Sequence, residues 1–267
     1  MKNVALGFMF FMLGATVLFA QVNHTKSYYG IPAGTINGAI VTYYDGMEVT
    51  ITPGYGECNG NYWEITESRE IDLTAAMHYY EEDFLYIYIS DSQSSYPNPH
   101  IYGLRGDSVL PQWDTSRLGV YYGNDRCIGV VYSDSCMSGG IPKFTAHGNG
   151  NLIRVINDEP YALVEEGTPT GSWIRITHMS DDCPVNATAV SIFAYETDSG
   201  NVDLSLTAYE TATAGKVCHE LSCAGYNRGS VSGWIQLGVS RDISWRGAAD
   251  DDSQSTFVYR NGFEYKR

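Results

Sequence analysis

Positively charged residues are scarce in this sequence. Its 267 residues include 16 Lys and Arg but 31 Asp and Glu, so the formal net charge at pH 7 is −15. A surface of that sign repels phosphate backbones and anionic lipid headgroups. The composition therefore argues against nucleic acid and anionic membranes as partners. It fits a soluble extracellular protein that binds cations or neutral ligands.

The spacings that mark catalytic and metal sites are also missing. The sequence has no G-x-S-x-G nucleophile elbow, no H-E-x-x-H zinc motif and no C-x-x-C redox pair. Adjacent acids such as Glu81 and Glu82 point to opposite faces of a strand, so they do not face each other as glycosidase carboxylates do. The acidic runs 180–182 and 249–253 are expected to be solvated turns, with Ca²⁺ binding as the alternative. We predict no catalytic residues, no metal site and no cofactor.

Only the first twenty residues form a long apolar run. Lys2 gives a positive start, the stretch from Val4 to Phe19 is apolar, and Ala20 is a small residue before Gln21. This layout is typical of a secretory signal peptide, and a membrane anchor is the alternative. We predict cleavage after residue 20, a secreted protein, and no insertion into a membrane after cleavage.

All six cysteines follow this leader, and an even number in an exported chain favours structural disulfides. They are Cys58, Cys127, Cys136, Cys183, Cys218 and Cys223. Cys218 and Cys223 form the pair nearest in sequence, and His219 between them leaves a metal cluster as the weaker alternative. Cys127 and Cys136 either join across one hairpin or each pair elsewhere. The connectivity stays open.

Strand patterns dominate the rest of the chain, and no segment keeps a 3.6-residue apolar period. The strand-like segments are 48–54, 83–90, 172–179, 189–197, 201–210, 232–239, 242–247 and 255–267. Segment 83–90 is apolar on both faces, which indicates a strand buried on both sides or one whose tyrosine face lies at an interface. The DSG at 198–200 predicts a hairpin turn between the strands that flank it. The fold class is therefore all-β, with one or two domains resembling a β-sandwich or jelly roll.

The composition also divides the chain. We predict a signal peptide (1–20), an extended N-terminal arm (21–38), a first β-domain (39–156), a linker (157–171) and a second β-domain (172–267). The linker range is acidic, contains two prolines and interrupts the strand pattern. Whether the two β-halves are separate domains stays open.

Tyrosine is unusually frequent, with 21 residues, and suits half-buried strand faces as well as surfaces that stack on sugars. The loop 95–103 places Tyr96, His100 and Tyr102 on either side of two prolines, and we predict that these three residues contact glycans. Two N-x-[ST] triplets make Asn23 and Asn186 candidates for N-glycosylation.

Several segments, in order, are similar to modules of bacteriophage tail-fibre and spike proteins. The segments are MEVTITPG (47–54), DFLYIYIS (83–90), NDRCIGVVYSD (124–134), GGIPKF (139–144) and NGFEYKR (261–267). The resemblance implies a non-enzymatic, elongated and self-associating appendage module that touches glycans. A leader and cysteines depart from the phage pattern and indicate a secreted, cellular relative.

The arm carries apolar side chains without a core of its own, at Val22, Tyr28, Tyr29 and Ile31. Such a segment can add as a strand to the sheet edge of a neighbouring copy. Completion of its own sheet and disorder are the alternatives. We therefore expect a secreted fibre or surface-appendage subunit whose main partner is a second copy of itself. A monomeric carbohydrate-binding adhesin and a polysaccharide-active enzyme are the second and third readings.

Overall fold

The computed structural model describes eleven stretches of the chain. They are residues 31–77, 83–91, 98–106, 110–133, 140–155, 162–167, 172–176, 183–208, 221–238, 240–247 and 255–267. Every regular element in these stretches is a β-strand, which confirms the all-β fold class. None of these residues belongs to a helix long and apolar enough to cross a membrane. The predicted leader and the arm residues Val22, Tyr28 and Tyr29 lie outside them.

Two three-stranded antiparallel sheets form from the first part of the chain. One contains β1 (Ile36–Gly38), β4 (Gly54–Cys58) and β5 (Asn61–Ile65), and the other β2 (Val41–Tyr43), β3 (Glu48–Ile51) and β6 (Arg69–Asp72). Asn59 and Gly60 have φ values of 50° and 83°, which is the conformation of a two-residue hairpin loop between β4 and β5. Asp45 sets the β2–β3 turn, because its carboxylate accepts hydrogen bonds from the backbone N–H groups of Met47 and Glu48.

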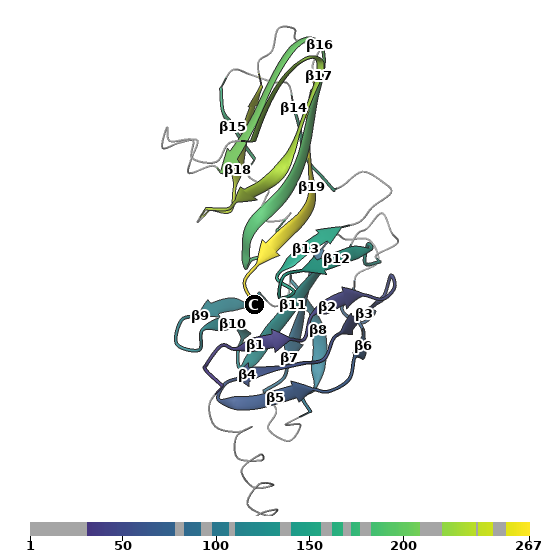
Figure 1. Ribbon diagram of the computed structural model, residues 1–267, viewed down its shortest axis with the longest axis vertical. Coiled ribbons are helices and arrows are strands. Elements are labelled where there is room, and N and C mark those ends of the chain that lie inside the picture. Colours follow the sequence, from purple (N-terminus) through teal and green to yellow (C-terminus); the bar gives the residue numbers. More distant parts are fainter. Residues whose placement is uncertain are drawn as a thin grey trace, which may run out of the picture.

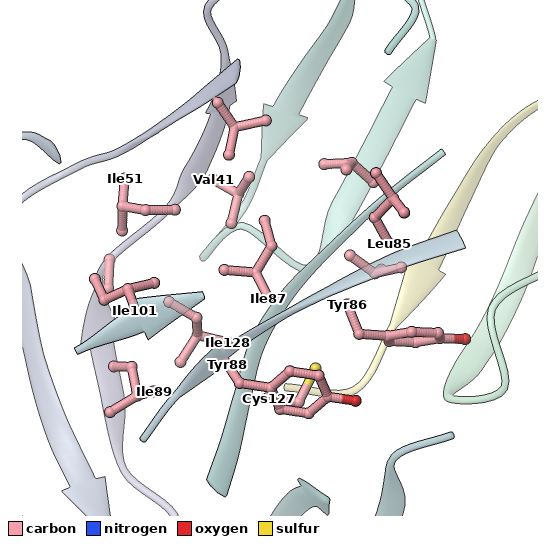
Figure 2. Packing of buried hydrophobic residues seen from close by; sticks show 14 of the residues in the cluster. Val41, Ile51, Leu85, Tyr86, Ile87, Tyr88, Ile89, Ile101, Cys127 and Ile128 are labelled. Atoms are coloured by element: carbon pink, nitrogen blue, oxygen red, sulfur yellow. The ribbon is translucent and has the colours of Figure 1, made fainter. Parts of the chain in front are cut away.

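A five-stranded antiparallel sheet follows, in the order β8-β7-β11-β10-β9. Its strands are β7 (Asp83–Ile89), β8 (Ile101–Arg105), β9 (Gln112–Asp114), β10 (Gly119–Tyr122) and β11 (Asp125–Ser133). Strand β7 lies beside β11 near the centre of this sheet, and its side chains from Phe84 to Ile89 are all buried. Figure 2 shows how they pack with residues of β2, β3 and β8. The prediction of a strand buried on both sides is thus confirmed.

The largest sheet holds the remaining strands. They are β12 (Phe144–His147), β13 (Leu152–Val155), β14 (Ala162–Gly167), β15 (Ile174–Ile176), β16 (Ala187–Ala208), β17 (Leu221–Gln236), β18 (Ile243–Gly247) and β19 (Ser255–Tyr265). The range 157–171, predicted as a linker, thus contains β14, which pairs with β19. The predicted hairpin at DSG is wrong: β16 runs through it, and only a register shift between Thr197 and Asn201 marks the site. The turn signal is local, and pairing with β17 on both sides of it overrides that signal.

The molecule is elongated, with β1 to β11 in the lower body of Figure 1 and β16 and β17 reaching to the top. Two apolar cores match these parts, and β19 belongs to both. Its Val258 packs in the upper core, whereas Phe263 and Tyr265 pack in the lower one. The last strand therefore connects the two cores.

Arg267, which follows β19, joins three segments that are far apart in sequence. Its guanidinium donates hydrogen bonds to the carbonyl oxygens of Ile128, Asn149, Gly38 and Ala39. Burial and the nearby charge of Arg126 lower the pKa of Arg267. Hydrogen bonds from a charged donor contribute about 1.5–3 kcal/mol each, so this contact is a major stabiliser of the lower body.

Arg126 makes a second contact of this kind and needs a glycine beside it. Its Nη2 atom donates to the carbonyl oxygens of Gly34 and Arg267, at 3.1 and 3.0 Å. A β-carbon on Gly119 would lie 1.0 Å from Nη1 of Arg126, which is inside the atom itself. Gly119 is therefore required for space.

We predict that Gly119→Ala lowers the free energy of unfolding by about 2–3 kcal/mol, because it displaces the buried guanidinium. Urea denaturation followed by tryptophan fluorescence measures this change. Gly46→Ala is the matched control: a β-carbon there meets nothing within 4 Å, so we expect a change under about 0.5 kcal/mol. Equal effects of the two substitutions would contradict the assigned role of Gly119.

Candidate functional site

The structure describes two of the three residues predicted to contact glycans. The rings of His100 and Tyr102 stack with their centres 5.7 Å apart, and Tyr102 stacks in turn on Tyr88 at 5.6 Å. This row arises because Tyr102 and Tyr88 are direct cross-strand partners of β8 and β7. Tyr96 lies outside the described residues.

The hydroxyl of Tyr102 is engaged within the protein. It donates a hydrogen bond to Asp125, whose other carboxylate oxygen accepts from the backbone N–H of Asp91 at 2.7 Å. The Asp91 carboxylate in turn accepts from the side chains of Asn59 and Asn61. Burial and the Asp125 contact raise the pKa of Tyr102, so its hydroxyl keeps its proton. This network fixes the end of the five-stranded sheet, and of the two described residues only His100 is solvent-exposed.

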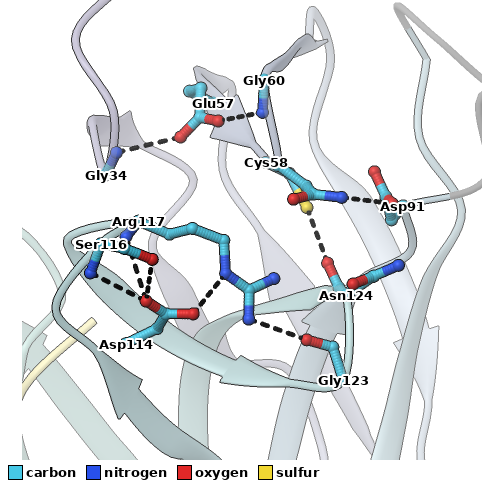
Figure 3. Close-up of polar contacts among 11 residues, drawn as sticks. Gly34, Glu57, Cys58, Gly60, Asp91, Asp114, Ser116, Arg117, Gly123 and Asn124 are labelled. Atoms are coloured by element: carbon cyan, nitrogen blue, oxygen red, sulfur yellow. Dashed lines mark hydrogen bonds and ion pairs between the residues drawn. The ribbon is translucent and has the colours of Figure 1, made fainter.

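The structure does not support the predicted disulfides. No disulfide joins two of the cysteines whose side chains it describes, Cys58, Cys127 and Cys183, and all three are buried. The Cys58 thiol donates to the carbonyl oxygen of Asn124 at 3.4 Å (Figure 3), and the Cys127 thiol donates to that of Gly129. Cys136 and Cys218 lie outside the described residues, and only the backbone of Cys223 lies within them.

Burial raises the pKa of the Cys127 thiol to about 12, against a usual value of 9.0. The folded state thus disfavours the thiolate. The contribution of the protonated thiol to the free energy of unfolding is complete below pH 9.0 and is lost as the pH rises toward 12.

We predict that iodoacetamide at pH 8 leaves Cys127 unmodified in the native protein and alkylates it after unfolding in guanidinium. Peptide mapping by mass spectrometry reads this out. Recovery of Cys127 in a disulfide with Cys136 would contradict the structure.

The side chain of Asn186, a predicted glycosylation site, already makes a hydrogen bond within the protein. Its Nδ2 atom, which a sugar would modify, donates to the carbonyl oxygen of Lys266 at 2.6 Å. Its Oδ1 atom is buried and accepts no hydrogen bond in the described part of the chain. Asn23 lies outside that part. Modification of Asn186 would first require the Lys266 contact to open.

One exposed aromatic surface was not singled out by the sequence analysis. Trp113, in the short edge strand β9, is 44% exposed, and the Nζ atom of Lys266 lies 5.0 Å from the centre of its ring. Trp113 lines three separate hollows, of about 500, 730 and 430 Å³. We call Trp113, Lys266 and these hollows the Trp113 site. Volumes of this size suit small ligands.

A tight turn lines the 500 Å³ hollow with Asp114 and Arg117, and Figure 3 shows the contacts within this turn. The Asp114 carboxylate accepts hydrogen bonds from the Ser116 hydroxyl and the Arg117 guanidinium, each at 2.6 Å. These contacts lower the pKa of Asp114. Arg117 also donates to the carbonyl oxygen of Gly123 and lies over the ring of Tyr121, 4.0 Å from its centre. The turn is therefore ordered before any ligand binds.

A second group of aromatic residues lies on the outer face of β16 and β19. Phe193 and Tyr195 alternate along β16 with buried Ile192 and Ala194, so they share the face away from the upper core. The Tyr195 ring stacks on Phe257 at 5.0 Å and on Tyr259 at 5.9 Å, with planes within 22° and 10°. These four rings, which we call the aromatic row, form one half-exposed surface next to β17.

The described residues contain no group of three His, Cys, Asp or Glu side chains that could hold a metal ion.

The sequence carried one local signal for the Trp113 site, a tryptophan followed by an Asp-x-x-Arg turn (113–117). Lys266 comes from the far end of the chain, so no local pattern shows that it lies beside Trp113.

No protein-family model and no curated protein matches this chain. The similar solved structures include a tryptic core variant of Cry1Da from Bacillus thuringiensis, with 9% identity and a TM-score of 0.18, covering 90% of this chain and 53% of that one. Another contains manganese lipoxygenase of Gaeumannomyces graminis with part of zonadhesin of Komagataella pastoris, with 12% identity and a TM-score of 0.17 over 89% and 96% of the two chains. The chain spans about half the length of the Cry structures it matches. Likenesses this weak carry no argument about function, and the resemblance to phage tail fibres stays a prediction.

Proposed function

We propose that this protein is a secreted, non-enzymatic subunit of an extracellular fibre. In this proposal residues 21–30 of one copy add as a strand to the outer edge of β17 in the next copy. The observation that carries the proposal is β17 itself. It is 16 residues long, and among the described strands it pairs only with β16.

The sequence of β17 lacks the usual protection of an edge strand. Residues 221–236 contain no proline and no lysine, and Arg228 is their one charged residue. Natural proteins protect exposed edges with such residues, with bulges or by keeping the strand short. β17 carries only Arg228 as a charge, and its pairing with β16 has one register shift, between Thr197 and Asn201, so most of this long edge presents backbone N–H and C=O groups to an added strand.

The side chains beside this edge favour a tyrosine-containing partner. Ser230 and Ser232 of β17 are exposed and lie directly opposite Tyr195 and Phe193 of the aromatic row. Because serine is small, a large side chain from an added strand could extend over it and reach the aromatic row. Neighbouring residues of a strand point to opposite faces, so either Tyr28 or Tyr29 would lie on this side.

The positions of the two segments favour a chain of copies over a closed dimer. The arm leads into β1 in the lower body, whereas β17 reaches the top of the molecule (Figure 1). β1 pairs with β4 of its own chain, and Gly34 N–H donates to Glu57, so residues 34–38 are held in place. The predicted donor arm of residues 21–38 is therefore wrong in its last part, because β1 completes a sheet of its own chain. The proposal uses residues 21–30, which span about 33 Å at full extension. Head-to-tail addition of this kind makes a filament when it does not close.

We predict that deletion of residues 21–30 abolishes assembly while the β-fold is kept, because β1 and its contacts stay. Sedimentation velocity and negative-stain electron microscopy measure assembly, and circular dichroism measures the fold. A synthetic peptide of residues 21–30 should inhibit assembly of the full-length mature protein. Filaments formed by the deleted protein would contradict the proposal.

A second prediction tests the acceptor edge. The double substitution Ser230→Lys and Ser232→Lys should block assembly, because an added strand would bury two ammonium groups and meet Lys26 of the arm. The matched control is Thr66→Lys with Ser68→Lys, at exposed positions between β5 and β6, which makes the same change in charge. We expect the control protein to assemble normally. Equal loss in both proteins would point to net charge instead of the β17 edge.

A further inference from the structure

Cationic side chains gather at the Trp113 site, although the chain as a whole is strongly acidic. The 430 Å³ hollow is lined by Trp113, by Arg126, Lys266 and Arg267, and by one acid, Glu264. Against a net charge of −15, three cations around one hollow form a local positive field. An anionic group is therefore favoured here more than elsewhere on the surface.

One of these cations, Arg126, has N–H groups without an acceptor in the described part of the chain. Arg126 is 1% exposed, and its two hydrogen bonds both come from Nη2. Its Nε and Nη1 atoms are buried and have no acceptor in the described part of the chain. Buried donors without an acceptor are uncommon, and here they add to the positive potential below the hollow.

Trp113 supplies a flat apolar surface next to this field. Its indole ring is open to solvent and matches the C–H face of a sugar ring, on which aromatic side chains stack. The 730 Å³ hollow on the other side shares Trp113, Thr188 and Lys266 with the cationic one. Polar groups that suit sugar hydroxyls surround the pair, among them Asn151 and Gln236.

We propose that the Trp113 site binds an acidic carbohydrate, a sugar that carries a carboxylate. The sugar ring stacks on Trp113, and the carboxylate pairs with the Lys266 ammonium above Arg126 and Arg267. The two hollows that meet at Trp113 accept at least two linked sugars. Gln236, the last residue of β17, lines the larger hollow, but Trp113 and the cationic side chains belong to other parts of the chain, so the inference does not depend on the proposed assembly.

Tryptophan fluorescence titration of the mature protein tests this inference. The acidic probes are trigalacturonate and sialyllactose, and the neutral counterparts are galactotriose and lactose. We expect the acidic probes to bind at least about tenfold more tightly than the neutral ones, and less tightly as salt rises. Failure of both acidic probes to bind, or equal binding of their neutral counterparts, would overturn the proposal.

Matched variants locate the site. Trp113→Ala should weaken binding about tenfold or more, whereas Trp234→Ala, which removes another exposed tryptophan, should leave it within about twofold. Lys266→Gln should reduce binding of the acidic probes, and Lys143→Gln, also at an exposed position, should not. Equal effects within either pair would overturn the assignment. The Ser230→Lys, Ser232→Lys protein should bind normally, which separates failure of this inference from failure of assembly.

Discussion

The lower body depends on the contact between the guanidinium of Arg267 and four main-chain carbonyl oxygens. These oxygens belong to the β1–β2 connection, to β11 and to the turn between β12 and β13. Arg267 and Gly38 are 229 residues apart in sequence, so this contact closes nearly the whole described chain into one body. Arg126 extends it by binding the carbonyl oxygen of Arg267, and Gly119 leaves the room that Arg126 needs. A planar, charged donor suits this position because it serves several acceptors at once.

The lower body is a closed part of the molecule, with its central strand covered on both faces, whereas the large sheet is an open part, with one face left uncovered. In the lower body β7 is buried on both faces, and the sheets around it enclose one core. The large sheet packs only one face of β16 into the upper core and leaves the aromatic row on the other face. Its strand β17 ends the sheet among the described strands. The proposed assembly therefore uses the open part, whereas the closed part holds β1 and the Trp113 site in place.

The sequence analysis offered two roles for the tyrosines, filling half-buried strand faces and stacking on sugars, and the structure distinguishes between them. Tyr86 and Tyr88 fill the lower core, and Tyr102 is bound to Asp125, so this tyrosine of the predicted glycan loop serves the fold. The exposed Trp113 lies instead on the short edge strand β9, where its ring stays 44% exposed beside Lys266. An aromatic residue in a strand pattern does not itself reveal which face is covered, because that depends on the sheets packed against it.

The sequence by itself determined the all-β class and the strands that became β7, β18 and β19, since alternation of side chains is a local property of the chain. For segment 83–90 it left open burial on both sides or a tyrosine face at an interface, and only the packed sheets decided for burial. It also limited the chemistry, through its charge and its missing motifs. Only the tertiary structure decided that DSG lies within β16, that the thiols of Cys58 and Cys127 donate to carbonyl oxygens, and that Lys266 lies over Trp113. Each of these depends on which strands pair and pack over long separations, and a local pattern specifies the faces of a strand but not its partners.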